Sequence, residues 1–241
     1  MYQKMARMYD YFMEDVPYEK WVEFVRHFTT QTNEKSLLDL GCGTGEISFR
    51  LAGDFKNVLG IDLSVDMIQQ AKQKIPTVHN IQFEQGDLVH LHQPVTYDVI
   101  ISFLDVLNYL RSPDEVKQAF GRIRKHLSPN GVFLFDVHSL DHMDRLIEDE
   151  LYAQITDEMS YVWFCQPGEV RGEVIYDLTF FMATEEERYE RFDELHTQRT
   201  YSVNDYLHWL EQAGFSQVSV YADFDYTKEN KYGDRLFFVC R

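Results

Sequence analysis

The sequence predicts an α/β fold, a doubly wound and mostly parallel sheet with a small antiparallel β insertion. Over the first 140 residues, short apolar runs alternate with segments whose apolar residues have helical spacing, which is typical of parallel strands joined by crossover helices. From about residue 150 to residue 201 the apolar residues instead alternate with a period of two, as in antiparallel strands. We therefore expect a main domain of residues 1–140 and 202–241, and an inserted subdomain of residues 141–201 that covers the substrate site.

The first half of the chain contains five predicted strands, each a short run rich in Val, Ile, Leu or Phe. They are residues 36–41, 57–64, 80–88, 97–104 and 131–139. In a parallel sheet of this kind, ligands bind beyond the carboxyl ends of the strands, at the point where the strand order reverses. We expect the functional residues to follow these strands.

Local signals mark where the helices begin and end. Pro17 suits the first turn of a helix that extends to residue 28, and Ser64 suits the N-cap of a second helix. The stretch "SPDE", residues 112–115, has the pattern of a capping box with proline at the first helical position. The stretch "SPNG", residues 128–131, is expected to end that helix.

The inserted segment is predicted to contain three strands. Turn signals at "QPGE" and "ATEEER" divide residues 150–201 into three runs with period-two alternation. The wound pattern then resumes with a helix over residues 202–215, which Gly214 is expected to end. Two final strands are predicted near residues 216–222 and 234–240.

The composition narrows the classes of function. At 241 residues, the chain has 40 acidic and 23 basic residues and a net charge of -17, which disfavours binding to nucleic acid. Its three cysteines, Cys42, Cys165 and Cys240, have no metal-ligand spacing and make a disulfide framework unexpected. Because no signal peptide or 18-residue apolar run occurs, we expect a cytoplasmic protein without a membrane anchor.

The segment "LLDLGCGTGEIS", residues 37–48, has glycines spaced G-x-G-x-G between a predicted strand and a helix. It lacks the P-loop pattern, and a dinucleotide fingerprint would need glycine where Glu46 stands. Carboxylates at Asp39 and Glu46 disfavour a phosphate, which binds bare N–H groups at a helix N-terminus. They suit S-adenosylmethionine, which has a sulfonium and an ammonium but no phosphate. At Gly41 and Gly43, a Cβ atom would intrude on such a ligand.

Two further carboxylates follow the next predicted strands. Asp62 is placed to accept hydrogen bonds from both ribose hydroxyls of an adenosine, and Asp87 to accept one from the adenine amino group. An acid at the position of Asp62 is also typical of dinucleotide-binding folds, so the combination with Asp39 and Asp87 is the more specific feature. For Asp39, a role in tying down the loop stays open beside a water-mediated link to the cofactor ammonium.

These motifs together resemble the class I S-adenosylmethionine-dependent methyltransferases. The segments "LLDLGCGTGEIS", "GIDLS", "QGDL", "YDVIISFLDVLNYL", "LSPNG" and "FDVHS" occur in the family's order and span nearly the whole chain. The resemblance is greatest to small bacterial members with an N-terminal lid helix and an inserted β-sheet. It implies a seven-stranded Rossmann-like sheet whose last strand is antiparallel. The cofactor contacts that it implies are Asp39, Gly41, Cys42, Gly43, Asp62, Leu63, Met67, Asp87, Leu88 and Phe103.

The resemblance also implies that the tyrosine-rich N-terminal segment, with Tyr9, Asp10, Tyr11 and Tyr18, folds over the cofactor as a lid. We therefore add Tyr9 and Tyr18 to the expected cofactor contacts. Amphipathic packing, with the hydroxyls in solvent, is the alternative for each tyrosine.

Candidate residues for the chemistry follow the fourth and fifth strands. Asp105, Asn108 and Tyr109 lie where methyl transfer occurs in this architecture, although Asn108 is equally suited to a turn and Tyr109 to packing. His138, after the fifth strand, is a candidate general base, with a structural role as the alternative.

The "H-x-x-R-x-Y" segment near the end of the insertion supplies two more candidates, His196 and Arg199. In a regular strand, His196 lies on one face, and Arg199 with Tyr201 lies on the other, so only one set can enter a given cavity. Arg199 has the alternative of pairing with Asp193 on its own face. His196 is a second candidate general base.

The predicted activity is transfer of a methyl group from S-adenosylmethionine to nitrogen or oxygen of a small-molecule acceptor by direct displacement, without a metal. The sequence contains neither the [DNS]-P-P-Y motif of base amino methylation in DNA nor the Pro-Cys pair of cytosine C5 methylation. Two alternatives are a non-catalytic S-adenosylmethionine-binding module and an NAD-dependent oxidoreductase. A homodimer is possible on the sequence alone.

Overall fold

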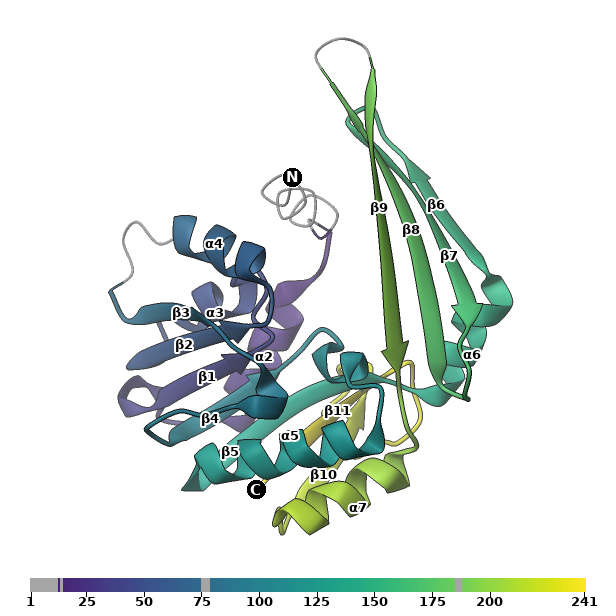
Figure 1. The fold of residues 1–241 in the computed structure, drawn as a ribbon. Helices are drawn as coiled ribbons and strands as arrows, with labels where there is room; N and C mark the ends of the chain where they lie inside the picture. The colour runs from purple at the N-terminus through teal and green to yellow at the C-terminus, as the bar shows by residue number, and fades with distance from the viewer. Residues whose placement is uncertain (1–12, 14, 75–78, 185–187) are drawn as a thin grey trace.

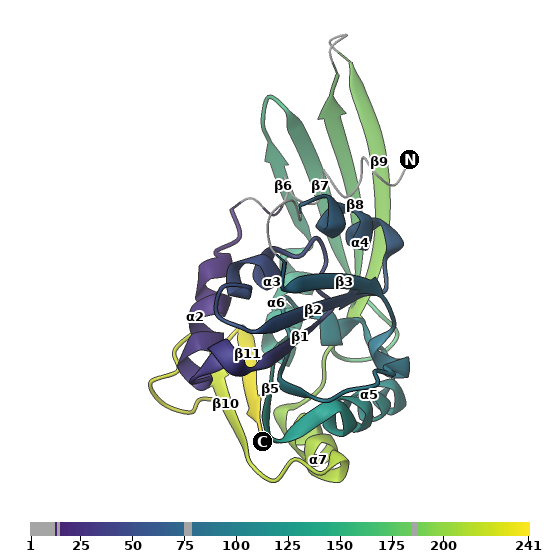
Figure 2. The ribbon, with the colours of Figure 1, turned by 90° about the vertical axis from the view of Figure 1, so that its left-hand side faces the viewer.

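The computed structural model describes residues 13, 15–74, 79–184 and 188–241. It contains two sheets, and the second projects from the edge of the first (Figures 1 and 2). In sheet A, the seven described strands have the order β10-β11-β5-β4-β1-β2-β3. They are β1 (Ser36–Leu40), β2 (Asn57–Asp62), β3 (Ile81–Gln85), β4 (Tyr97–Ser102), β5 (Leu127–His138), β10 (Val218–Ala222) and β11 (Arg235–Cys240).

The directions of the strands confirm the predicted fold class. β11 pairs antiparallel with both β10 and β5, and the other neighbours in sheet A pair parallel. The described α-helices are α2 (Tyr18–Phe28), α3 (Glu46–Leu51), α4 (Val65–Gln73), α5 (Pro113–His126), α6 (Leu140–Asp149) and α7 (Val203–Ala213). Three short 3₁₀ helices are η1 (Thr32–Glu34), η2 (Leu88–His90) and η3 (Val106–Tyr109).

Two hydrophobic cores lie on the two faces of sheet A. Alternate residues of one strand enter opposite cores, because side chains of a strand point to its two faces in turn. Leu38 of β1 joins the core that includes α5 and α7, whereas its neighbour Leu37 joins the core that includes α2, α3 and α4. Helices therefore cover both faces of the sheet, and its carboxyl edge is left for the site (Figure 1).

Most of the predicted helix caps are present in the structure. The Ser64 hydroxyl accepts from the Met67 N–H, and the capping box of Ser112 and Glu115 is present at the start of α5. Gly214 ends α7 with a φ of 95°, and Pro17 is the N-cap of α2 rather than part of its first turn.

Sheet B is formed by the inserted segment. Its four described strands are antiparallel, in the order β6 (Leu151–Ile155), β7 (Met159–Pro167), β8 (Glu173–Ala183) and β9 (Tyr189–Arg199). The inner face of sheet B packs against α6 through a core that includes Met143, Leu146, Tyr176 and Phe180. The domain boundaries at residues 140 and 202 stay a prediction.

Three details of the predicted elements were wrong. The prediction of three strands missed the turn between β6 and β7, which contains neither glycine nor proline and is closed by Thr156 bonding to Met159. Helix α6 was not predicted, although Ser139 caps it by accepting from the His142 N–H. The strand predicted at residues 131–139 begins earlier, at Leu127, so "SPNG" lies inside β5, where the register opposite β4 is irregular. Helix α5 does end directly before this stretch, at His126.

Among the described residues, no helix is long and apolar enough to cross a membrane. Cys42, Cys165 and Cys240 are free thiols, as the sequence predicted.

Candidate active site

The glycine loop turns sharply between β1 and α3. Gly41, Gly43 and Gly45 have φ angles of 76°, 53° and 86°, which other residues rarely adopt. The N–H groups of Gly41 and Cys42 donate to the Ile61 carbonyl, at 2.7 and 3.1 Å. This pairing holds the loop against the carboxyl end of β2.

Gly41 and Gly43 are required for different reasons. A Cβ atom on Gly41 would lie 2.4 Å from the Val106 side chain, whereas a Cβ atom on Gly43 would meet nothing within 4 Å. The prediction that a Cβ atom at Gly41 would intrude on the ligand was therefore wrong. The obstacle there is the Val106 side chain of the protein itself. Gly43 faces open space, and Val106 places the start of η3 directly against the loop.

Replacing Gly41 with alanine is expected to lower the free energy of unfolding by about 2–3 kcal/mol, because the left-handed backbone and the contact with Val106 both oppose a Cβ atom. Gly121 in α5 is the matched control, since a Cβ atom there meets nothing within 4 Å. Gly121→Ala is expected to leave stability unchanged or raise it by up to about 1 kcal/mol. Urea-induced unfolding followed by circular dichroism measures both, and equal effects of the two substitutions would contradict this account.

Asp62, at the end of β2, holds the loop from the side. One carboxylate oxygen accepts from the Gly43 N–H at 2.8 Å, and the other from the Ser64 N–H at 2.8 Å. Burial raises the pKa of this carboxyl group. Each oxygen keeps a second lone pair, so the pair fits the two hydroxyls of a ribose.

The surroundings of Asp62 fit the rest of an adenosine. Leu63 is 68% exposed, which is unusual for a large apolar side chain at the end of a buried strand. Met67 lies half-buried in the first turn of α4. Asp87 caps η2 by accepting from the Val89 N–H at 2.8 Å, and Leu88 beside it is partly buried.

Asp39 lies beneath the loop and is 3% exposed. Its carboxylate accepts from the Ser48 hydroxyl at 2.6 Å, so its described partner is a side chain of α3 rather than the backbone of the loop. Burial raises the pKa of Asp39 to about 7, and the charge of Asp62 adds to this effect.

The raised pKa of Asp39 makes the stability of the ligand-free protein fall as the pH rises from 5 to 7. The folded state holds a proton on Asp39 in this range, and the unfolded state, with a pKa near 3.8, does not. The loss amounts to at most about 2.7 kcal/mol, at roughly 1.36 kcal/mol per pH unit. Asp39→Asn is expected to remove this part of the pH dependence. Denaturant titrations at pH 5, 6, 7 and 8 measure it, and parallel profiles of the two proteins would contradict the assignment.

Glu46 occupies the start of α3, where a dinucleotide would place its pyrophosphate. It forms ion pairs with Arg50 and with Lys74, the second at 2.9 Å. The Glu46 side chain stands where the dinucleotide fingerprint requires glycine, and a carboxylate at this helix terminus disfavours a phosphate there.

The remaining predicted cofactor contacts lie in different settings. Phe103 is 2% exposed and packs edge-on to Phe24 in the core. Burial and the nearby Asp39 raise the pKa of the Cys42 thiol, which disfavours a nucleophilic thiolate.

Tyr18 is buried at the start of α2, with the Arg50 guanidinium 4.9 Å from its ring centre. Tyr9, Asp10 and Tyr11 lie outside the described residues. The contacts of these side chains with a cofactor stay predictions.

A second group of polar residues surrounds Asp105, directly beyond β4. Leu104 and Asp105 both have positive φ angles, 62° and 55°. The Asp105 carboxylate accepts from Arg235 at 3.1 Å and from the Gln198 amide at 2.6 Å, and the His138 Nε2 lies 3.5 Å away. Burial acts to raise the pKa of Asp105, but His138 and Arg235 hold it well below its usual value.

Asp136 of β5 supports this turn from beneath and is fully buried. One of its oxygens accepts from the Trp21 indole and from Arg235, both at 2.8 Å. The other accepts from the Asp105 N–H at 3.0 Å. The network joins α2, β5 and β11 to the residue that turns the chain into η3, and it fixes the position of the Asp105 carboxylate.

Asn108 and Tyr109 have different roles in the structure. The fully buried Asn108 amide donates to the Arg199 carbonyl and accepts from the His138 N–H, both at 3.0 Å. It therefore joins η3 to the ends of β5 and β9. Tyr109 is half-exposed, and its hydroxyl lies 3.3 Å from the His196 Nδ1.

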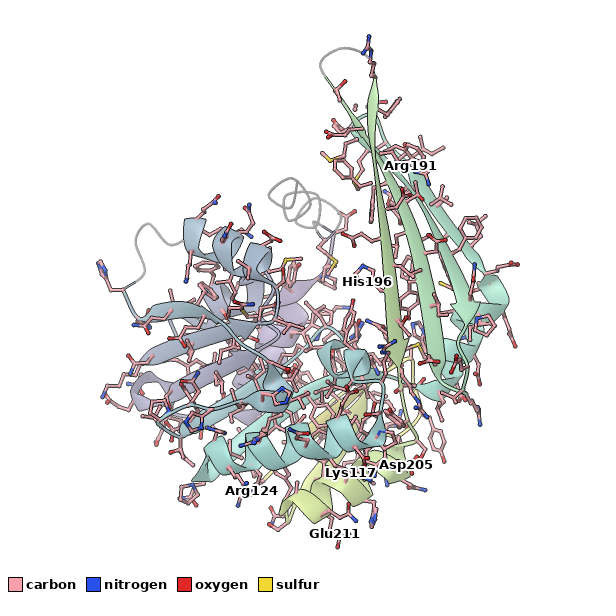
Figure 3. The ribbon with its side chains drawn as sticks, viewed as in Figure 1. Lys117, Arg124, Arg191, His196, Asp205 and Glu211 are labelled. Carbon is pink, nitrogen blue, oxygen red and sulfur yellow. The ribbon has the colours of Figure 1, made fainter. Side chains whose placement is uncertain are left out.

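β9 is regular, with one residue of β8 opposite each of its residues. Glu194, His196 and Gln198 therefore share the inner face of sheet B, and Figure 3 shows His196 on the side of β9 that faces sheet A. The His196 Nε2 lies 2.7 Å from the Glu194 carboxylate. The structure thus brings His196 together with Tyr109, and Gln198 of the same face together with Asp105.

Arg199 lies apart from this group. Its guanidinium donates to the Arg111 carbonyl at 2.8 Å and stacks 4.6 Å from the Tyr201 ring centre. Asp193, which the sequence offered as a partner, instead pairs with Arg191.

Sequence reasoning missed Glu194 and Gln198 on β9, and Asp136 and Arg235 beneath Asp105. Period-two spacing from His196 points to Glu194 and Gln198, because all three must share one face. Among the described residues, no group of three or more His, Cys, Asp or Glu side chains is arranged to hold a metal ion.

Comparison with known proteins identifies the family. A family profile described as a methyltransferase domain matches residues 31–214. A Geobacillus sp. (strain WCH70) protein and the Bacillus subtilis (strain 168) protein YqeM, both provisionally named methyltransferases, are 39% and 37% identical to the chain. Both matches span 100% of this chain, and they cover 99% and 97% of those proteins.

A solved structure gives the same answer. The crystal structure of an S-adenosylmethionine-dependent methyltransferase from Clostridium acetobutylicum ATCC 824 superposes with a TM-score of 0.85 and 28% identity, covering 100% of this chain and 98% of that one. These matches set aside the NAD-dependent oxidoreductase and the non-catalytic module. The chain belongs to the class I S-adenosylmethionine-dependent methyltransferases, and it is an enzyme that uses S-adenosylmethionine.

Proposed function

We propose that the enzyme methylates nitrogen or oxygen of a small-molecule acceptor by direct displacement, between the carboxyl edge of sheet A and the inner face of sheet B. The observation that carries the proposal is the meeting of polar side chains from both sheets. Gln198 and His196 of β9 contact Asp105 and Tyr109, which follow β4. The contact between Val106 and Gly41 puts this group beside the cofactor loop.

The residues that would hold S-adenosylmethionine are the glycine loop and Asp62, with Asp39 supporting the loop from beneath through its bond with the Ser48 hydroxyl. The cofactor supplies a methyl carbon bound to a positively charged sulfur. The protein's main contribution is to orient the acceptor and exclude water, an effect that reaches roughly 7–11 kcal/mol in well-oriented systems. Sheet B borders such a site through Glu194, His196 and Gln198 of β9, which share its inner face.

Two facts support a small acceptor over a nucleic acid. The net charge of -17 opposes a polyanionic substrate. A Streptomyces venezuelae protein named dTDP-3-amino-3,4,6-trideoxy-alpha-D-glucopyranose N,N-dimethyltransferase is 29% identical over 116 residues, which is 47% of this chain. The name of that relative describes transfer to an amino group of a small molecule.

The test is methyl transfer from methyl-tritiated S-adenosylmethionine to separate acceptor pools. The purified full chain is incubated with a metabolite extract of molecules below about 1 kDa, with total RNA and with genomic DNA. We expect label in the small-molecule pool alone. Label confined to either nucleic acid would contradict the proposal.

A further inference from the structure

Two buried polar atoms beside Asp105 lack hydrogen-bond partners among the described residues. They are the Gln198 Oε1 and the His138 Nδ1. Gln198 is only 3% exposed, and the side chain of His138 is 15% exposed. Buried polar groups are almost always paired with protein, water or ligand. Both residues also contact the Asp105 carboxylate, at 2.6 Å for Gln198 and 3.5 Å for His138. The two unpaired atoms therefore make the surroundings of this carboxylate the place to look for a ligand.

When His138 is neutral and its ring proton is on Nε2, both atoms present lone pairs rather than protons. An ionised carboxylate only accepts hydrogen bonds, so the Gln198 nitrogen must be the atom 2.6 Å from Asp105, and its oxygen points elsewhere. The His138 Nε2 faces the same carboxylate at 3.5 Å. With the ring proton on Nε2, Nδ1 has a free lone pair. The missing partner must therefore donate.

The number of acceptors discriminates between classes of substrate. A neutral primary amine has two N–H groups and one lone pair, so it can donate to both acceptors and keep its lone pair for reaction. A hydroxyl group has a single proton to donate, and a carboxylate has none. Glu194, on the same face of β9, adds a negative group that disfavours an anion.

We infer that Gln198 and His138 form the subsite for the amino group of the methyl acceptor, and that this acceptor is a primary amine. The inference rests on the proposed function and names its substrate class. The nitrogen lone pair forms the new bond to the methyl carbon, and the carbon–sulfur bond breaks with its electrons remaining on sulfur. One N–H proton then passes to the His138 Nδ1, and its bonding electrons stay on nitrogen. The product is a secondary amine.

The surroundings of His138 suit it to receive this proton. The imidazolium that forms would lie against the Asp105 carboxylate, which Arg235 and Gln198 hold in place. His142 stacks on His138 with ring centres 4.5 Å apart. Burial and, once His138 is protonated, its positive charge lower the pKa of His142 to about 4. His142 is therefore neutral at pH 7 and adds no opposing charge.

The test uses methylamine, the smallest primary amine, as the probe of the subsite. Full-length protein with ¹⁵N-labelled histidine is saturated with S-adenosylhomocysteine and titrated with methylamine, methanol or acetate, and the His138 Nδ1 resonance is followed. We expect a saturable shift with methylamine and none with the other two. Gln198→Met is expected to weaken methylamine binding at least 10-fold. Gln212→Met is the matched control, since Gln212 lies on the exposed side of α7 and bonds only to His208 among the described residues.

Equal responses to methylamine and methanol, or unchanged methylamine binding by a folded Gln198→Met protein, would overturn the inference. If that variant fails to fold, the comparison of the three probes on the wild type decides alone.

The chemistry of the labelled product separates this inference from the proposed function. Label retained after mild alkaline hydrolysis and recovered as secondary amine supports the inference. Label in ethers or esters overturns it but leaves the proposed function standing, and the absence of any labelled small molecule removes both.

Discussion

Replacing Asp62 with alanine is expected to weaken S-adenosylmethionine binding by about 100-fold or more. Among the described residues near the loop, the Asp62 carboxylate is the group that we expect to accept from both ribose hydroxyls. A hydrogen bond to a charged group contributes roughly 1.5–3 kcal/mol. Two such bonds correspond to a factor of at least about 100. The substitution also removes the acceptors of the Gly43 and Ser64 N–H groups, which lie 2.8 Å from the carboxylate oxygens.

Isothermal titration calorimetry with S-adenosylmethionine and S-adenosylhomocysteine measures this effect. Asp114→Ala is the matched control, because the Asp114 side chain is 95% exposed on α5 and pairs only with Lys117 among the described residues. The control is expected to bind as the wild type does. Wild-type affinity of the Asp62→Ala protein would show that the ribose is bound elsewhere.

Removing the Asp136 carboxylate is expected to lower the free energy of unfolding by about 3–5 kcal/mol, the usual cost of breaking a buried ion pair from one side. Asp136→Ala would leave the Trp21 indole and the Asp105 N–H without their acceptors. It would also leave Arg235, whose side chain is 18% exposed, with Asp105 as its remaining carboxylate partner.

Guanidinium-induced unfolding followed by tryptophan fluorescence measures this loss. Asp193→Ala is the control, because Asp193 pairs with Arg191 on the exposed face of sheet B, and exposed pairs contribute about 0–1 kcal/mol. Asp136→Asn keeps one acceptor oxygen without the charge, and we expect an intermediate loss. A loss below about 1 kcal/mol for Asp136→Ala would contradict the role of this network.

The cofactor side of the site was more accessible to sequence reasoning than the acceptor side. Asp39, the three glycines and Asp62 lie within one strand–loop–helix–strand unit, so their spacing along the chain determines their arrangement in space. Gly41 shows the limit of that reasoning, because its constraint comes from Val106, 65 positions later in the sequence. The sequence predicted the need for glycine there but not the contact that causes it.

The acceptor side depends on pairings between distant segments. Arg235 reaches Asp136 because β11 pairs with β5 in a register that places Phe237 opposite Asp136. Neither residue indicates that register. Gln198 is different, because its position two residues from His196 already puts both on one face of β9, although its contact with Asp105 needed the placement of sheet B.

Two elements of the inserted segment, helix α6 and the turn between β6 and β7, were missed because their local sequence signals are weak. Ser139 and the spacing of Met143, Leu146 and Ile147 are consistent with α6, yet six charged or histidine positions among its ten residues obscured the helical pattern. The turn between β6 and β7 uses the Thr156 hydroxyl in place of glycine or proline, so the two strands read as one run.

A crystal structure of the complex with S-adenosylhomocysteine would show whether the cofactor and acceptor sites adjoin at the start of η3. We expect the ribose hydroxyls on Asp62, the adenine beside Leu63, and the sulfur facing the Asp105 turn, with Gln198 and His138 beyond it. A cofactor bound away from the glycine loop, or a sulfur directed away from Asp105, would contradict this arrangement.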